Sequence, residues 1–229
     1  MLIVLPPSET KAPGGEQDGM ELSFPSLDPI RTSLIDELSH TLVDTPASKQ
    51  AEAEENLVLR SAPVMPAVYR YTGVLYDALD AASLPQTALD RLAIGSALFG
   101  VVRAGDTIPR YRLSGGMKLG GRTLKSWWGS AISEVLAGEG FVVDMRSGVY
   151  QQLGRVPDGG AGGMTIRVEQ ADTGKVVSHF NKRYKGELAR ALSTSPNIDS
   201  ASSATDVADI ASAANFRVEV RGSELVLLV

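Results

Sequence analysis

Apolar residues along this chain occur in two patterns, as short continuous runs and as positions spaced three or four residues apart. Continuous runs are typical of buried strands, and they predict strands at residues 2–5, 92–102 and 141–145. The wider spacing is typical of one face of a helix. It predicts helices at residues 27–43, 48–60, 66–82, 86–91, 123–138, 182–192 and 206–213.

Turn-forming residues divide the remaining segments into hairpins. We expect one hairpin to join residues 164–170 to 175–180 and another to join residues 216–220 to 224–229. A strand at residues 110–113 is expected to turn at Gly115 and Gly116 into residues 117–119. Two helices carry start signals, Asp28 as an N-cap before Pro29 and Thr123 as an N-cap.

Strands and helices alternate along the chain, and this predicts the mixed α/β (α+β) class. We expect one domain over residues 1–229, with a mixed β-sheet surrounded by helices. Residues 27–91 form a helix-rich insertion within that domain.

The charge is distributed unevenly along the chain. The net charge is −5, but residues 95–190 hold 14 Lys or Arg against 8 Asp or Glu, whereas the rest hold 8 against 19. A surface of one sign concentrates anions such as phosphates. A solvated basic face with no ligand explains the same counts.

Composition excludes several classes of site. The chain has no cysteine and two histidines, His40 and His179, so thiolate metal sites, disulfides and cysteine nucleophiles are excluded. We expect no metal and no cofactor, and the phosphate-loop pattern is absent from the sequence. Residues 1–5 are too short for a signal peptide, and no apolar run approaches the roughly 18 residues that span a bilayer. We expect a cytoplasmic protein with no membrane partner.

The loop after the first strand is one candidate anion site, because ligands often bind where strands of α/β sheets end. Ser8 and Thr10 offer hydroxyls there, and Lys11 offers a positive charge. An ordinary polar loop is the alternative.

A second cluster follows the run at residues 92–102. An arginine fork at Arg103 or Arg112 binds phosphate or carboxylate, and Asp106 could orient it or move a proton. Strand alternation would place Tyr111 on the face opposite Arg112. A structural ion pair between Arg103 and Asp106 is the alternative.

Two further candidates lie later in the chain. Ser147 and Tyr150 follow the strand at residues 141–145, where hydroxyls suit either substrate binding or turn capping. The helix that begins near residue 182 combines a helix N-terminus, which favours anions, with four cations. These cations are Lys182, Arg183, Lys185 and Arg190.

Six ordered segments resemble the peroxide stress protein YaaA family across nearly the whole chain. They are MLIVLPPSETK (1–11), TGVLYDAL (72–79), GSALFGVVRAGDTIPRYRLSGG (95–116), WWGSAISEVL (127–136), MRSGVYQQL (145–153) and VSHFNKRYKGELAR (177–190).

The resemblance implies a helix-decorated mixed sheet with a positively charged cleft, formed here by segments within residues 95–190. It also implies double-stranded DNA as partner, a role in limiting oxidative damage during peroxide stress, and a link to lowered free iron. A helix-hairpin-helix element is attributed to the family, and residues 72–91, with Gly73, are its candidate here. The chain departs from the family at its first motif, where Glu9 brings a carboxylate, and at Gly105.

Two hypotheses of different classes follow. In the first, the chain is a DNA-binding stress protein whose Lys182, Arg183 and Lys185 contact phosphates. In the second, it is an enzyme acting on a phosphorylated or nucleotide-like small molecule. There, cations such as Lys11 and Arg112 hold the anion, and Asp106, Tyr150 or Lys11 handles protons.

Overall fold

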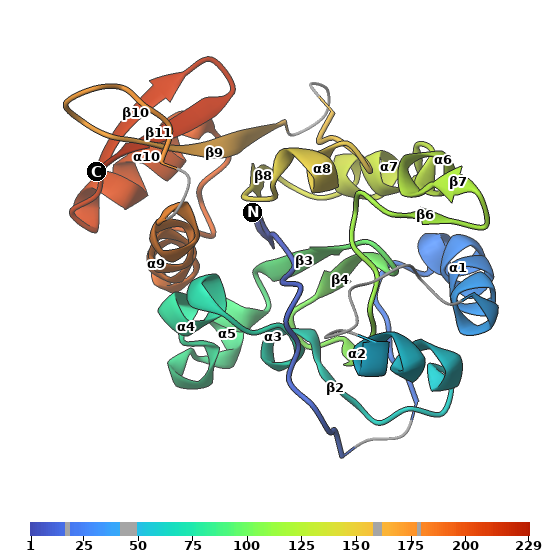
Figure 1. Ribbon diagram of the computed structural model, residues 1–229. Coiled ribbons are helices and arrows are strands. Elements are labelled where there is room, and N and C mark those ends of the chain that lie inside the picture. Colours follow the sequence, from blue (N-terminus) through green and yellow to red (C-terminus); the bar gives the residue numbers. More distant parts are fainter. Residues whose placement is uncertain (17–18, 42–49, 158–161, 178–179) are drawn as a thin grey trace.

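A seven-stranded sheet forms the centre of the fold, and helices surround it (Figure 1). The computed structural model describes residues 1–16, 19–41, 50–157, 162–177 and 180–229. The strands of this sheet are β1 (Leu2–Leu5), β3 (Leu92–Ser96), β4 (Gly100–Arg103), β8 (Val142–Asp144), β9 (Gly163–Glu169), β10 (Arg217–Arg221) and β11 (Glu224–Leu228). The expected mixed α/β class with one mixed sheet is confirmed.

The strand order is β10-β11-β9-β8-β1-β3-β4. β1 pairs in parallel with both β3 and β8, β8 with β9, and β9 with β11, whereas β4 and β10 are antiparallel at the two edges. The chain leaves β1 for β3 on one side and later returns to its other side as β8. In such sheets, the crevice beyond the carboxyl ends at this switch point is the usual ligand site.

The helices are short, and two of them are longer than ten residues. They are α1 (Asp28–His40), α2 (Gln50–Glu54), α3 (Ala67–Arg70), α4 (Val74–Leu79), α5 (Gln86–Leu89), α6 (Leu124–Trp128), α7 (Ala131–Ala137), α8 (Gly148–Gln151), α9 (Asn181–Thr194) and α10 (Ala204–Ala213). Two small sheets pair β2 (Val64–Pro66) with β5 (Thr107–Pro109), and β6 (Lys118–Leu119) with β7 (Arg122–Thr123). None of the helices in the described ranges is long and apolar enough to cross a membrane.

Helix α9 packs closely against α4 and α5, as Figure 1 shows. Gly186 makes this contact possible, because a Cβ atom at that position would lie 2.3 Å from the carbonyl oxygen of Leu75. The N-terminal half of α9 is thereby held beside the carboxyl end of β1, which it also contacts.

A buried arginine covers the outer edge of β4. Arg31 of α1 donates from Nε to the carbonyl oxygen of Phe99 at 3.0 Å and from Nη2 to that of Val101 at 2.8 Å. Its Nη1 donates to Oδ1 of Asp28 at 2.8 Å and to the carbonyl oxygen of Ser23 at 2.7 Å. Asp28 is therefore the first residue of the helix and a partner of Arg31, and its prediction as an N-cap is wrong.

Most predicted elements are present, and three strand predictions differ from the structure. The run at residues 92–102 is two antiparallel strands, since the chain turns back after Ser96 and Gly100 takes a φ of +75°. Residues 110–113 are irregular, and the nearby hairpin is formed by β6 and β7. The expected hairpin of residues 164–170 and 175–180 is, over its described part, a short antiparallel contact: Glu169 bridges Val176, and the N–H groups of Gln170 and Val177 donate to Lys175 and Val168, both at 2.9 Å. The longer pairings of β9 are with β8 and β11.

The helix predictions differ mainly in length. The segments at residues 66–82 and 123–138 each form two helices, broken at Gly73 and Gly129. Thr123 caps α6 by accepting a hydrogen bond from the backbone N–H of Ser126, as expected. The predicted helix ends at residues 42–43 and 48–49 and the expected hairpin residues 178–179 lie outside the described residues.

Gly186→Ala tests the α9–α4 contact. Alanine normally stabilises a helix interior by about 1 kcal/mol relative to glycine. Here we expect the opposite, a loss of about 1–3 kcal/mol, because the added methyl group meets the Leu75 carbonyl. Urea unfolding measures the change, and Gly148→Ala in α8, where a Cβ atom meets no described atom within 4 Å, is the control. Equal effects of both substitutions would contradict the contact.

Candidate functional site

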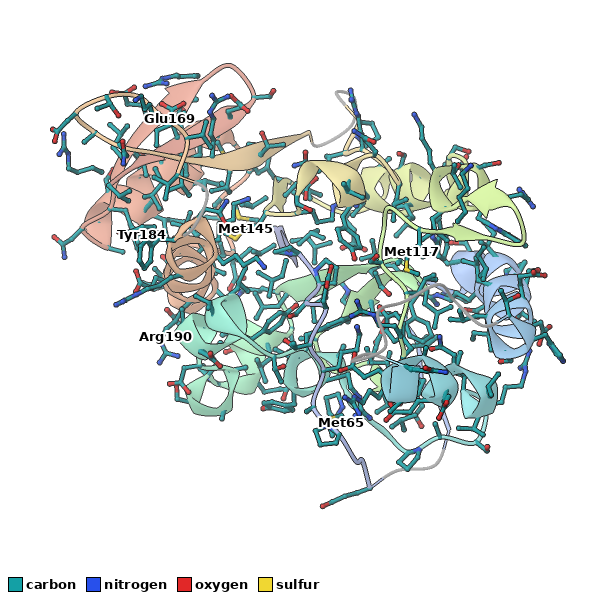
Figure 2. The ribbon with its side chains drawn as sticks, viewed as in Figure 1. Met65, Met117, Met145, Glu169, Tyr184 and Arg190 are labelled. Atoms are coloured by element: carbon teal, nitrogen blue, oxygen red, sulfur yellow. The ribbon has the colours of Figure 1, made fainter. Side chains whose placement is uncertain are left out.

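A pocket of about 700 Å³ lies beyond the carboxyl ends of β1 and β8, at the switch point of the sheet. Its walls are the segment after β1, the glycine turn at residues 114–116, the loop and helix at residues 145–151, the outer part of β9 and the start of α9. Met145, labelled in Figure 2, lies between the end of β8 and α9. We call this cavity the switch-point pocket.

An ion pair fixes the wall that follows β8. Arg146 donates from Nε to Oδ1 of Asp144 at 2.8 Å and from Nη2 to Oδ2 at 2.9 Å, and both side chains are buried. Nη2 also donates to the carbonyl oxygen of Gly154 at 2.8 Å. The Arg146 side chain lies against Gly95 of β3, where a Cβ atom would be 2.6 Å from its Cδ. Two residues of β8 and its loop thus tie the pocket wall to the sheet.

Two lysines of α9 face the switch-point pocket. Lys185 donates from Nζ to the carbonyl oxygen of Met145 at 2.9 Å, and burial lowers its pKa to about 8, with Asp144 acting in the opposite direction. Lys182 is exposed at the rim and has no ion-pair partner among the described residues. Ser147 lines the same pocket from the N-cap position of α8. The structure thus brings together three of the predicted anion-binding residues, Lys182, Lys185 and Ser147.

The other two cations of α9 lie elsewhere. Arg183 pairs with Glu187, with Nε to Oε1 at 2.7 Å, on an exposed face. Arg190 donates to the carbonyl oxygens of Leu79 and Asp80, at 2.9 and 3.1 Å, and supports the turn after α4. It lies toward the opposite end of α9 from Met145 (Figure 2). Neither residue lines the pocket.

Lys11 lies in a buried aromatic cluster behind the pocket. Its Nζ donates to the carbonyl oxygen of Ser8 at 3.1 Å and lies 4.3 Å from the centre of the Tyr111 ring. Burial, and then the charge of Arg112, lower the pKa of Lys11 to about 7. The hydroxyl of Tyr111 is hydrogen-bonded to those of Tyr71 and Ser96, each at 2.7 Å.

The hydroxyls of the first loop bond to the protein itself. Ser8 Oγ and Thr10 Oγ1 are 3.0 Å apart, and Thr10 also donates to the carbonyl oxygen of Thr72. Neither Ser8 nor Thr10 lines the switch-point pocket.

Glu9 and Tyr150 connect this cluster to the pocket, since both line it. Glu9 faces Arg112, with Oε2 to Nη2 at 3.6 Å, and Arg112 also faces Glu52 at 3.7 Å. The hydroxyl of Tyr150 accepts a hydrogen bond from the Gly115 N–H at 3.2 Å, and burial raises its pKa, with Glu9 adding to the shift. Sequence reasoning recognised Glu9 only as a departure from the family motif.

Arg103 and Asp106 have other partners. Arg103 pairs through Nη2 with Glu139 at 2.7 Å. The Asp106 carboxylate accepts hydrogen bonds from the N–H and hydroxyl of Ser23 and from the backbone N–H of Arg103, at 2.9, 2.7 and 3.0 Å. The alternative of a side-chain ion pair between Arg103 and Asp106 is therefore wrong. Both residues lie outside the pocket lining.

Acidic residues from the rest of the chain neutralise much of the basic segment at residues 95–190. Arg110 pairs with Glu52 and Glu55, Arg112 with Glu9 and Glu52, and Arg190 with Asp80. Among the described cations that line the pocket, Arg146 pairs with Asp144 and Arg167 with Glu169, whereas Lys182 and Lys185 form no ion pair with a described residue.

The helix-hairpin-helix candidate consists of α4, a short 3-10 helix at Ala81–Ser83, and α5. Its turn amides are already used: the N–H of Asp80 donates to Tyr76, that of Ser83 to Asp80 and that of Leu84 to Ala81. Asp80 adds an exposed carboxylate. Gly73 precedes α4 with a φ of +103°.

The described residues contain no group of three or more His, Asp or Glu side chains that could hold a metal ion. His179 lies outside those residues.

Comparison with known proteins shows the family. Residues 1–219 match the family described as peroxide stress protein YaaA, and the chain belongs to this family. A UPF0246 protein of Corynebacterium efficiens is 54% identical over 96% of this chain and 95% of its own length. One from Corynebacterium glutamicum is 52% identical, with the same coverage. One from Streptomyces coelicolor is 40% identical over 84% of this chain and 82% of its own length.

Asp144→Asn tests the ion pair that fixes the pocket wall. The substitution leaves the buried Arg146 charge without its counter-ion, so we expect a loss of about 3–5 kcal/mol in the free energy of unfolding. Urea unfolding measures it. Glu187→Gln, which breaks the exposed pair with Arg183, should cost less than about 1 kcal/mol. A loss at Asp144 no larger than this control would show that the pair does not support the fold.

Lys11→Met tests the lowered pKa of Lys11. Above pH 7 the folded protein holds this amine neutral, whereas the unfolded chain keeps its proton up to the ordinary value of 10.5. The stability of the native protein relative to Lys11→Met should therefore rise with pH between 7 and 10.5, by at most about 1.4 kcal/mol per pH unit. Below pH 7 the difference should be constant.

Paired unfolding curves across this pH range measure the effect, and the exposed Lys118→Met is the control. A flat difference for Lys11 as well as for Lys118 would refute the buried, neutral amine.

Proposed function

We propose that this chain is a cytoplasmic peroxide-stress protein that binds double-stranded DNA at the switch-point pocket and limits iron-driven damage to it. The observation that carries the proposal is the meeting of Lys182, Lys185 and Ser147 at the open end of the sheet. The role in peroxide stress and the link to iron rest on the family to which the chain belongs.

The start of α9 suits a phosphate group for three physical reasons. The first amides of a helix have no partner within it in the α-helical pattern, and the helix dipole adds partial positive charge there. In α9 the N–H of Arg183 donates to Phe180, so the amides of the first turn before it are the ones that could meet a phosphate. Lys182 is exposed, so it can reach a phosphate without breaking an ion pair. Lys185 sits deeper, and an approaching anion favours its charged form, which a pKa of about 8 leaves partly populated at neutral to mildly alkaline pH.

A second candidate function is an enzyme acting on a phosphorylated or nucleotide-like small molecule in the same pocket. Its volume of about 700 Å³ favours this candidate, since pockets for small molecules span about 300–1,000 Å³. In that case Glu9 and Tyr150 lie in the pocket wall as groups for proton transfer. Lys11 lies behind them with a pKa of about 7.

Lys182→Ala combined with Lys185→Ala tests the DNA-binding proposal. We expect weaker binding to a short duplex and a salt dependence of log K reduced by about two, one for each lost phosphate contact. Fluorescence anisotropy at a series of salt concentrations measures both.

The control is Lys118→Ala combined with Lys125→Ala, which removes the same charge from β6 and α6, on the side of the molecule opposite α9 (Figure 1). Thermal unfolding of both double variants verifies folding. If the two double variants bind duplex equally, the lysines of α9 are not the DNA site. If the α9 variant instead loses affinity only for nucleoside phosphates, the enzyme candidate replaces the DNA-binding one.

A further inference from the structure

The outer edge of the sheet at β10 is exposed. Four of its five residues are exposed, and Val218 is half-buried. Within the described residues β10 pairs on one side alone, with β11, in an unbroken antiparallel register from Arg217–Leu228 to Arg221–Glu224. Figure 1 shows this strand at the periphery of the molecule, beyond α10.

The opposite edge of the same sheet is protected. The residues of β4 are almost entirely buried, and Arg31 occupies the carbonyl oxygens of Phe99 and Val101 there. Proteins protect an edge that must not pair by a short strand, charged side chains (lysine above all), proline, a bulge or a covering side chain, because bare N–H and C=O groups recruit another strand. The charges of β10 are of both signs, so they oppose pairing in some registers and favour it in another. β10, with the sequence RVEVR, has no lysine or proline.

The hairpin geometry fixes which backbone groups face outward. β10 and β11 are joined by a two-residue loop, Gly222 and Ser223. In such a hairpin, the pair next to the loop is hydrogen-bonded and such pairs alternate along the ladder. Arg221, Glu219 and Arg217 therefore direct their backbone groups toward β11, and Val220 and Val218 direct theirs outward.

The side chains of β10 are complementary to a second copy of themselves in one register. Within one chain, Glu219 Oε2 already accepts from Nε and Nη2 of Arg221, at 3.0 and 2.6 Å, on an exposed face, and no described residue bonds to its other oxygen, Oε1. With Val218 opposite Val218 of the partner subunit, Arg217 faces Glu219 of the partner subunit, and the reverse pair forms by symmetry. On the other face of the sheet, Phe216 then meets Val220 of the partner subunit. The register with full overlap instead places Glu219 opposite Glu219 of the partner subunit, which is unfavourable.

We propose that two copies of this chain associate through antiparallel pairing of their β10 strands, with Val218 on the two-fold axis, to form one continuous sheet. The interface is isologous, as in most homodimers. A single five-residue strand offers less than the ~800 Å² per partner of a standard interface, so the dimer depends on protein concentration.

Two single variants of opposite charge test both the interface and its register. Arg217→Glu leaves carboxylates at both positions that pair across the interface, 217 and 219, and Glu219→Arg leaves guanidinium groups at both, with Arg221 unchanged in each variant. Each alone should be monomeric at concentrations where the native chain dimerises, because like charges then face each other. An equimolar mixture of the two should dimerise again, since every cross-strand pair becomes a Glu–Arg pair.

Sedimentation velocity from about 5 to 500 μM measures association, with far-UV circular dichroism and thermal unfolding as checks of folding. Val218→Pro is a third variant, chosen because it removes one outward N–H and leaves the bonds to β11 in place. We expect it to weaken association at least tenfold. A native chain that stays monomeric over this range would overturn the proposal. So would a dimer that survives Val218→Pro, or a mixture of the charge variants that remains monomeric.

Discussion

The buried ion pair between Asp144 and Arg146 is the constraint on which the arrangement of the pocket depends. It joins the last residue of β8 to the loop that follows, and Arg146 continues to the carbonyl oxygen of Gly154. Removing one partner of such a pair leaves an uncompensated charge in the interior, so the loop has one favourable position. That position leaves the Met145 carbonyl oxygen facing Lys185, and α9, held against α4 at Gly186, supplies the lysine. The Asp144–Arg146 ion pair and the contact of α9 with α4 at Gly186 therefore together fix the positions of the two walls of the switch-point pocket.

The excess of unpaired positive charge in residues 95–190 is smaller in the folded protein than the sequence count suggests. The arginines of residues 95–190 meet carboxylates from distant segments, as Arg110 meets Glu52 and Arg103 meets Glu139. These pairs support the walls around β1 and leave less positive charge free than the count suggests. Of the described cations that line the pocket, the two arginines are paired with carboxylates and the two lysines of α9 are not, and the phosphate-binding proposal depends on these lysines.

The sequence predicted those parts of the site that depend on local pattern. β1 and β8 are continuous apolar runs, and the helical spacing after residue 181 brings Lys182 and Lys185 to one face of α9. The sequence did not predict the parts of the fold that depend on contacts between residues far apart along the chain. β9 makes its long pairings with β8 and β11, and the expected hairpin is a short contact around Glu169 and Val176 in the described residues. Residues 110–113 are irregular because Asn56 bonds both backbone groups of Arg112. Arg146 was missed because a two-residue Asp-x-Arg spacing carries no signal of burial.

Hydrogen exchange of the full chain, with and without a short DNA duplex, tests the central claim most directly. The account predicts slower exchange on DNA binding in the segments that line the switch-point pocket, at residues 145–151 and at the start of α9. Protection confined to the hairpin at residues 72–91, with the pocket segments unchanged, would contradict it and would place the DNA on α4 and α5 instead.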